Sequence, residues 1–473
     1  MTVKANDANG RPVPGRGSLW PWILGIGCVL VILIAMLLPR QAGRSGGTGP
    51  AAGPGGAASD HSGSAAGGLR PHARAGALAG PTAQEIVAGK VSQFARKRWE
   101  TVQAMARHFK VDVPDEMKRF FAAVEAGRWE EADALFKAMS EKRESSSTSS
   151  NTVEALQKLW PAVMETYGVA EEAHNWPAQQ LLDYGNAVLD SLRPGMVYVG
   201  GTDAGRFIPT LLNETSDGSQ HIILTQNAFA DGTYLDYVRF LYGDQMAMLT
   251  PEESQQAFQD YMADATQRLQ HDQQFPDEPQ QLRPGEDVRM TDGRVQVSGQ
   301  VAVMCINELM LQTLMQKNPD TAFALQESFP FKSTYADATT LGPIMELGNQ
   351  DAQAGLTPER ATQSLDYWRT TAQELLSDPD TPQGSVPRDA YSKLLVSQAN
   401  LFLDRDYSGQ AEEALRLATQ LAPASPEAVF SYADLLAKEN RFAEASQLVQ
   451  TALTLAPANQ GFQTLLQTLS THK

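Results

Sequence analysis

The chain has 473 residues, with 38 Lys and Arg against 55 Asp and Glu, so its formal net charge is −17. Its length and its hydrophobic content of 42% suit two or three globular domains. An acidic chain repels phosphate backbones, which argues against nucleic-acid binding by the bulk of the protein. The two cysteines, Cys28 and Cys305, lie in unrelated apolar segments, so the fold does not depend on a disulfide.

After an N-terminal tail (residues 1–18), residues 19–38 are apolar without a single charge. A helix of this length spans about 30 Å, which matches the hydrocarbon core of a bilayer, and Trp20 lies where interfacial tryptophans gather. The segment predicts a single transmembrane helix. A cleaved signal peptide is the alternative, but residues 37–41 offer no small-x-small cleavage site. Cys28 lacks the leucine expected three residues earlier in a lipoprotein signal.

The distribution of basic residues around this segment favours a cytoplasmic N-terminus. Three basic residues precede the segment and two, Arg40 and Arg44, follow it closely. We therefore expect an inner-membrane protein whose C-terminal body is periplasmic. Residues 39–82 are rich in Gly, Ala, Pro and Ser, which cannot bury enough apolar surface to fold, so they predict a flexible linker.

Residues 83–192 have apolar residues at helical spacing and predict a helical domain. Within it, residues 120–136 predict a helical hairpin whose Gly127-Arg128-Trp129 turn matches Asn440-Arg441-Phe442 near the end of the chain. The serine-rich run 145–150 predicts a loop. Three aromatic residues are expected in the core: Trp160, Trp176 and Tyr184. The carboxylate pairs are expected on solvated helix faces: Asp115-Glu116, Glu130-Glu131 and Glu171-Glu172.

Residues 193–350 predict a central α/β domain, because the apolar period changes there. Residues 196–199 and 221–225 are β-rich runs, and between them lie a glycine-rich turn and a helix beginning near Phe207. This is a Rossmann-like βαβ unit with two parallel strands. Further strands are expected at 323–327 and 343–347, a hairpin at 288–297, and an apolar helix over 301–315 that covers one face of the sheet.

Polar residues follow the predicted parallel strands, where loops diverge and small ligands bind in such sheets. The candidate ligand-binding residues are Gly201, Thr202, Asp203, Arg206, Gln226, Asn227 and Glu327. An arginine there suits an anion, and carboxylates accept hydrogen bonds from hydroxyls. The same residues also suit a tight turn, a helix cap and a surface ion pair. The glycine spacing matches neither the dinucleotide fingerprint nor a phosphate-binding loop.

Residues 358–473 contain a repeat with a period of 34, over residues 392–425 and 426–459. The matched positions are Leu395, Ala399, Phe402, Ala411, Leu415, Ala418 and Pro423, recurring as Val429, Ala433, Leu436, Ala445, Val449, Ala452 and Pro457. Small residues at this spacing allow two antiparallel helices to approach, and the proline ends the second helix. The pattern resembles the tetratricopeptide repeat. The hairpin at 120–136 resembles the centre of one such unit, although an unrelated helical hairpin is a close alternative.

Tetratricopeptide repeats usually bind other proteins on the concave face, which the first helix of each repeat lines. The candidate partner-binding residues are Lys393, Asn400, Asp404, Glu427, Phe430, Asp434 and Lys438. Two repeats rarely stand alone, so we expect the helix around Trp368 or the α/β domain to cover one end of the stack.

Residues 191–203 and 225–228 extend the resemblance to an uncharacterised family of bacterial membrane-anchored tetratricopeptide proteins, which covers most of residues 83–473. A weaker similarity links about fifty residues to the soluble tail of membrane glycosyltransferases of the protein O-mannosyltransferase type. That enzyme class carries its chemistry in many membrane helices, whereas this chain has one predicted span. Neither resemblance implies catalytic residues here.

No residue set in the chain specifies a reaction, a metal or a cofactor. The seven histidines are scattered, and neither a Gly-x-Ser-x-Gly elbow nor a nucleophile–base pair is evident. The sequence therefore favours a membrane-anchored scaffold, mainly α with a central α/β domain, that binds a protein partner through its repeats. The alternative is an α/β domain that binds a small polar or anionic ligand, of the sugar or nucleotide-sugar class, in envelope glycan metabolism.

Overall fold

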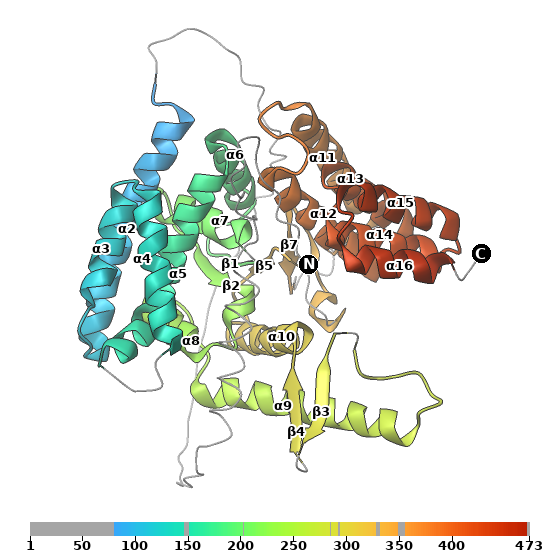
Figure 1. Cartoon of the computed structure of the whole chain (residues 1–473), viewed down its shortest axis with the longest axis horizontal. Coiled ribbons are helices and arrows are strands. Elements are labelled where there is room, and N and C mark those ends of the chain that lie inside the picture. The colour runs from blue at the N-terminus through green and yellow to red at the C-terminus, as the bar shows by residue number, and fades with distance from the viewer. Residues whose placement is uncertain are drawn as a thin grey trace, which may run out of the picture.

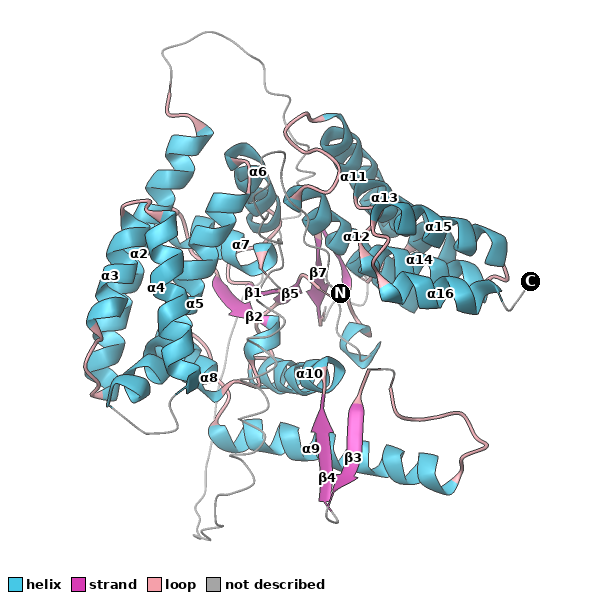
Figure 2. Cartoon of the chain, viewed as in Figure 1, coloured by secondary structure: helices cyan, strands magenta, loops and turns pink. Residues whose placement is uncertain are grey.

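The computed structural model describes residues 80–145, 151–201, 203–283, 285–291, 294–327, 332–348 and 355–470. In these residues the protein is mainly helical around a small mixed sheet (Figures 1 and 2). The predicted membrane helix at 19–38 and most of the predicted linker lie outside them. Within the described ranges, no helix combines the length and the apolar character that crossing a bilayer requires.

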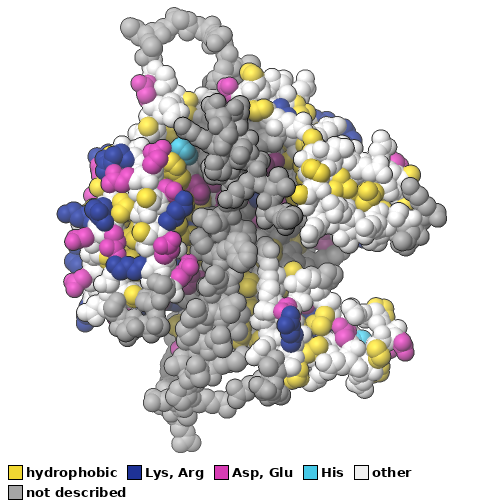
Figure 3. Space-filling model, in the orientation of Figure 1, with side chains coloured by type: hydrophobic (Ala, Val, Ile, Leu, Met, Phe, Trp, Pro, Cys, Tyr) yellow, Lys and Arg dark blue, Asp and Glu magenta, His cyan; other side chains and the backbone are white. Residues whose placement is uncertain are grey.

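The N-terminal helices form one side of the molecule, as predicted for residues 83–192 (Figure 1). They are α2 (Ala83–Phe109), α3 (Asp115–Glu125), α4 (Trp129–Ser145), α5 (Asn151–Asn175) and α6 (Ala178–Leu189). Thr82 begins α2 with a capping box: its hydroxyl accepts from the Glu85 backbone N–H, and the Glu85 carboxylate accepts from the Thr82 N–H. Trp160, Trp176 and Tyr184 are buried, as expected for core residues. On the face shown in Figure 3, charges of both signs intermingle over this helical layer.

The predicted βαβ unit is confirmed. Strand β1 (Val197–Gly200) leads into α7 (Ala204–Glu214) and then into β2 (Ile222–Thr225), which pairs with β1 in parallel, Val197 opposite Ile222. The remaining strands are β5 (Phe323–Leu325), parallel to β1, and the antiparallel strands β7 (Ile344–Leu347) and β6 (Thr339–Leu341). The order is β2-β1-β5-β7-β6, so the sheet is mixed, and β6 is a strand that the sequence did not predict.

A helix and a hairpin project from the body below the sheet (Figure 1). The projecting part comprises α9 (Pro251–Gln274), β3 (Asp287–Thr291) and β4 (Arg294–Ser298). The neighbouring elements in the chain are η1 (Gln226–Ala228), α8 (Gly232–Tyr242), α10 (Gln300–Lys317) and η2 (Lys332–Tyr335). The antiparallel pairing of β3 with β4 confirms the predicted hairpin. The expectation that α10 covers the sheet was wrong: α10 packs chiefly against α9 and η1. Its apolar residues bury against that helix and turn instead.

The C-terminal helices form the other side of the molecule (Figure 1). They are α11 (Pro358–Ser377), α12 (Val386–Asp404), α13 (Ser408–Leu421), α14 (Pro426–Lys438), α15 (Phe442–Leu455) and α16 (Gln460–Ser470). The predicted repeats correspond to the hairpins α12–α13 and α14–α15. Helix α11 packs on α13 and α12 on β7, so both expected covers for the end of the stack are present.

Two hydrophobic cores divide this half of the molecule. The main core runs without a break from Val87 in α2 to Leu435 in α14, so α12 and α13 share it with the sheet. A separate cluster, centred on Val429, Ala445 and Phe462, holds α14, α15 and α16 together. Helix α12 is therefore part of the α/β core as well as the first helix of the repeat stack.

The α3–α4 hairpin has the same turn as the two repeats. A residue with positive φ ends each first helix: Gly127 (69°), Asp406 (58°) and Asn440 (62°). The N–H of the next residue then donates to a carbonyl five positions back, at 2.9, 2.9 and 2.8 Å respectively. Phe120 occupies the position that Ala399 and Ala433 hold in the repeats, twelve residues before a buried alanine in each hairpin. The hairpin therefore resembles a tetratricopeptide unit in its turn. It differs at the helix crossing, where a large phenylalanine replaces the small alanine of the repeats.

Candidate functional site

The glycines after β1 allow the backbone to pack against the residues after β5. The Gly201 N–H donates to Oε1 of Gln326 at 2.7 Å, and Nε2 of Gln326 donates to the Tyr184 hydroxyl at 2.9 Å. A Cβ at Gly201 would overlap the Glu327 carboxyl group, and one at Gly205 would overlap the Gln326 amide. Gln326 and Glu327 therefore fill the crevice between the neighbouring parallel strands β1 and β5, where the sequence predicted a small ligand.

Several polar atoms near the ends of β1 and β2 are buried without a hydrogen-bond partner. They include Oδ1 of Asp203, Oδ1 of Asn227 and both amide atoms of Gln226, a residue with 0% exposure. Asp203 is at the N-cap of α7 with φ 47°, yet its side chain makes no capping hydrogen bond, so the predicted capping role was wrong for Asp203. Thr202, the other candidate cap, lies outside the described residues.

Arg206 is not on the surface, where one expectation from the sequence placed it in an ion pair. It is buried in the first turn of α7, with its guanidinium 4.1 Å from the ring centroid of Phe207. Burial lowers the pKa of Arg206, and the carboxylates of Glu165 and Asp203 partly oppose that effect. The side chain therefore belongs to the interior of the domain.

Two carboxylates that the sequence placed on a solvated helix face lie at this site instead. Glu172 is only 7% exposed, and Glu171 is half-buried beside it. Burial, reinforced by the charge of Asp203, raises the pKa of Glu172 to about 8 and that of Glu171 to about 7. The signal was present in the sequence: Val169 and Trp176 flank Glu172 at helical spacing, and both are buried.

The two candidate sets meet at Lys393. Burial favours the neutral amine, but the carboxylates of Glu427, Glu327, Asp203 and Asp389 outweigh that effect and raise the pKa of Lys393. Glu427 and Lys393 come from the predicted partner-binding set, whereas Asp203 and Glu327 come from the predicted ligand set. Lys393 is half-buried on α12, and these carboxylates are within electrostatic range of its amine.

Only part of the predicted concave face is open, because α12 packs on β7. Nε2 of Gln398 donates to the Ile344 carbonyl at 2.8 Å, which fixes that contact. On α12, Asn400 is exposed, and Asp404 is half-buried with an oxygen 2.9 Å from the Arg405 guanidinium.

The exposed part of that face lies on α14. Glu427, Asp434 and Lys438 are exposed there, with Lys438 2.7 Å from Asp434 in an ion pair along the helix. Phe430 is 37% exposed and leans on Phe462 of α16, with ring centroids 5.4 Å apart. We call these four residues, Glu427, Phe430, Asp434 and Lys438, the α14 row.

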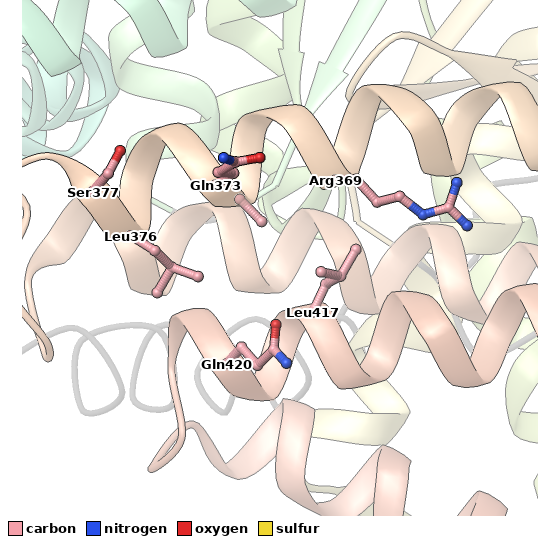
Figure 4. A pocket seen from close by; sticks show the side chains of 7 residues that line it. Arg369, Gln373, Leu376, Ser377, Leu417 and Gln420 are labelled. Carbon is pink, nitrogen blue, oxygen red and sulfur yellow. The ribbon is translucent and has the colours of Figure 1, made fainter.

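A groove of about 340 Å³ lies elsewhere, between α11 and α13 (Figure 4). It is lined by Arg369, Ala372, Gln373, Leu376, Ser377, Leu417 and Gln420. No residue predicted from the sequence lines it, and Arg369 at one end pairs with Glu413 at 2.6 Å. Among the described residues, no group of His, Cys, Asp and Glu side chains has the arrangement of a metal site.

A family model for the tetratricopeptide repeat matches residues 407–469, which cover α13 to α16. Comparisons with curated proteins and with solved structures found no match to the chain. Domains of this family generally mediate binding between proteins. The C-terminal helices are thus similar in both sequence and hairpin geometry to a class of protein-binding repeats.

Proposed function

We propose that this protein is a membrane-anchored adaptor that binds a protein partner through the α14 row. The observation that carries the proposal is the position of the tetratricopeptide match: α15 and α16 share a cluster with one side of α14, while Glu427, Asp434 and Lys438 on α14 stay exposed. The anchor would be residues 19–38, with a cytoplasmic N-terminus and a periplasmic body. Their apolar composition and the flanking basic residues support this arrangement.

The test is copurification from detergent-solubilised membranes with the full chain and a charge-reversed variant, Asp434→Lys with Lys438→Glu. Both side chains are exposed, so the exchange keeps the ion pair and the fold while it inverts the pattern of charge. Gln447→Lys with Gln450→Glu, on exposed positions of α15, is the matched control. We expect a partner that is lost with the first variant and kept with the second. A set of copurifying proteins that is the same for both variants would contradict the proposal.

The orientation has its own test. In intact cells with a permeable outer membrane, externally added protease should cleave the C-terminal body and leave a cytoplasmic tag at the N-terminus intact. Protection of the body would contradict a periplasmic location.

The second candidate function, binding of an anionic sugar nucleotide by the α/β domain, is disfavoured by the charges at the strand ends. The Glu327 carboxyl group lies against Gly201 and Asp203 lies at the N-cap of α7, so an anion bound there would face these two carboxylates. Gln326 also fills the crevice between β1 and β5.

A further inference from the structure

The chain between α9 and β3 folds back on the last turn of α9, at the outer end of the projecting part of the molecule (Figure 1). We call residues 275–283 the arm loop. The carboxylate of Asp272, in the last turn of α9, accepts hydrogen bonds from two N–H groups of this loop: Gln281 at 2.7 Å and Leu282 at 3.0 Å. These bonds attach the second half of the arm loop to the helix.

His271, in the same helical turn, lies between two carboxylates. Its Nδ1 is 3.3 Å from Oδ1 of Asp272, and its Nε2 is 3.3 Å from Oε2 of Glu278 in the arm loop. The ring centroid of Phe275, where the loop begins, is 5.2 Å from that of the imidazole. The side chain of His271 is 23% exposed and that of Asp272 10%, so water reaches these contacts only in part. Both ring nitrogens therefore face acceptor oxygens.

Only a protonated imidazole can donate to both carboxylates. A neutral imidazole has one N–H, so its second nitrogen presents a lone pair to a carboxylate oxygen, and the two repel each other. An imidazolium donates from both nitrogens, and its positive charge strengthens both contacts. Histidine is the side chain whose charge ordinarily changes between about pH 5 and pH 8.

The other charged groups around this turn pair with one another, so they leave the imidazole to its two carboxylates. The pairs are Arg268 with Asp264 and Glu286, Arg283 with Asp264 and Glu286, and Arg289 of β3 with Asp287. Asp277, the second acidic residue of the arm loop, is exposed. Within the part of the chain that the structure describes, the ion pairs of His271 are those with Asp272 and Glu278 alone.

We propose that His271 is a pH-sensitive latch, which holds Glu278 and the middle of the arm loop against α9 when it is protonated and releases them when it is neutral. Closure is therefore strongest at acidic pH and weakens as the pH rises through the range in which histidine loses its proton. Asp272 stays ionised across that range, because the backbone hydrogen bonds from Gln281 and Leu282 lower its pKa. The loop thus opens at Glu278 and stays attached at Leu282. This device is independent of the proposed adaptor function.

The test is hydrogen–deuterium exchange of the full chain in detergent, followed by mass spectrometry, at about pH 5.5 and pH 8. Protection is expressed relative to the intrinsic exchange rate at each pH, which removes the direct effect of pH on exchange. The variants are His271→Gln and Glu278→Gln, and Asp277→Asn is the matched control, because it removes a charge from the same loop without touching the ring. The turn at 405–407, which contains no histidine and whose N–H groups donate to carbonyls at the end of α12, is the internal reference.

We expect protection of the arm loop in the wild type to fall about fivefold from pH 5.5 to pH 8, while the reference turn does not change. Asp277→Asn should show the same fall. His271→Gln and Glu278→Gln should remove it, with a reference turn as protected as in the wild type. A wild-type loop that is equally protected at both pH values would overturn the latch, and so would a fall that persists in His271→Gln. A fall of equal size in the reference turn would also overturn it, because that result reports a change in global stability.

Discussion

Replacing Glu172 by Gln should stabilise the protein much more at pH 8 than at pH 5. The folded-state pKa of Glu172 is raised to about 8, chiefly by burial, whereas an unfolded glutamate has a pKa of about 4.3. Between these values the folded state binds more protons than the unfolded state, so the free energy of unfolding falls as the pH rises. The isosteric amide carries no charge, so the variant escapes this loss.

The magnitude follows from the separation of the two pKa values. One pKa unit corresponds to about 1.4 kcal/mol. Integration from pH 5 to pH 8 gives a decrease on the order of 3 kcal/mol in the free energy of unfolding of the wild type, which the variant does not share. For a chain of this size that corresponds to a Tm difference of about 5 °C at pH 8. Wild type, Glu172→Gln and the exposed control Glu130→Gln are compared by differential scanning fluorimetry at half-unit pH steps. A variant that is no more stable than wild type at pH 8 would refute the assigned burial and charge environment.

Two further predictions concern packing and buried charge. Gly205→Ala should destabilise the protein by about 1–3 kcal/mol, because the added Cβ overlaps the amide group after β5, whereas Gly409→Ala has open space and should not. Equal denaturation midpoints for these two variants would contradict the close approach. Arg98→Met should cost about 3–5 kcal/mol in urea unfolding, because it leaves the carboxylates of Glu165 and Glu214 without their buried partner. A loss below about 1 kcal/mol would show that the glutamates find other partners.

Local patterns in the sequence predicted the elements that depend on neighbouring residues. The β-rich runs around Tyr198 and Ile223 with a helix between them sufficed for the parallel pair, because the crossover rule leaves one arrangement. The 34-residue period located α12 to α15 for the same reason: each hairpin repeats its own small and large residues. The three-residue strand β6 has little pattern of its own and forms by pairing with β7.

The surroundings of the candidate site residues could not be predicted from the sequence, because they arise from contacts between segments that are distant in the chain. Seen alone, Glu171-Glu172 is an ordinary charged pair, and the burial of Glu172 becomes visible only once α5 packs against other helices, α7 among them. Lys393 was assigned to an open face because a repeat was assumed to keep its concave side free. In this chain α12 packs on β7, and Lys393 is half-buried within electrostatic range of Asp203 and Glu327.

The division of the hydrophobic core has a consequence for how this architecture can vary among related chains. Because α12 and α13 share the core of the sheet, their loss would expose the α/β domain, and no shorter array is compatible with a folded body. Helices α15 and α16 rest on a separate cluster, and α14 contributes to both that cluster and the main core. Duplication of the α14–α15 hairpin would lengthen the superhelix outward without disturbing the sheet. The array is therefore free to grow in one direction only, away from the strands, and added repeats would leave the α/β domain unchanged.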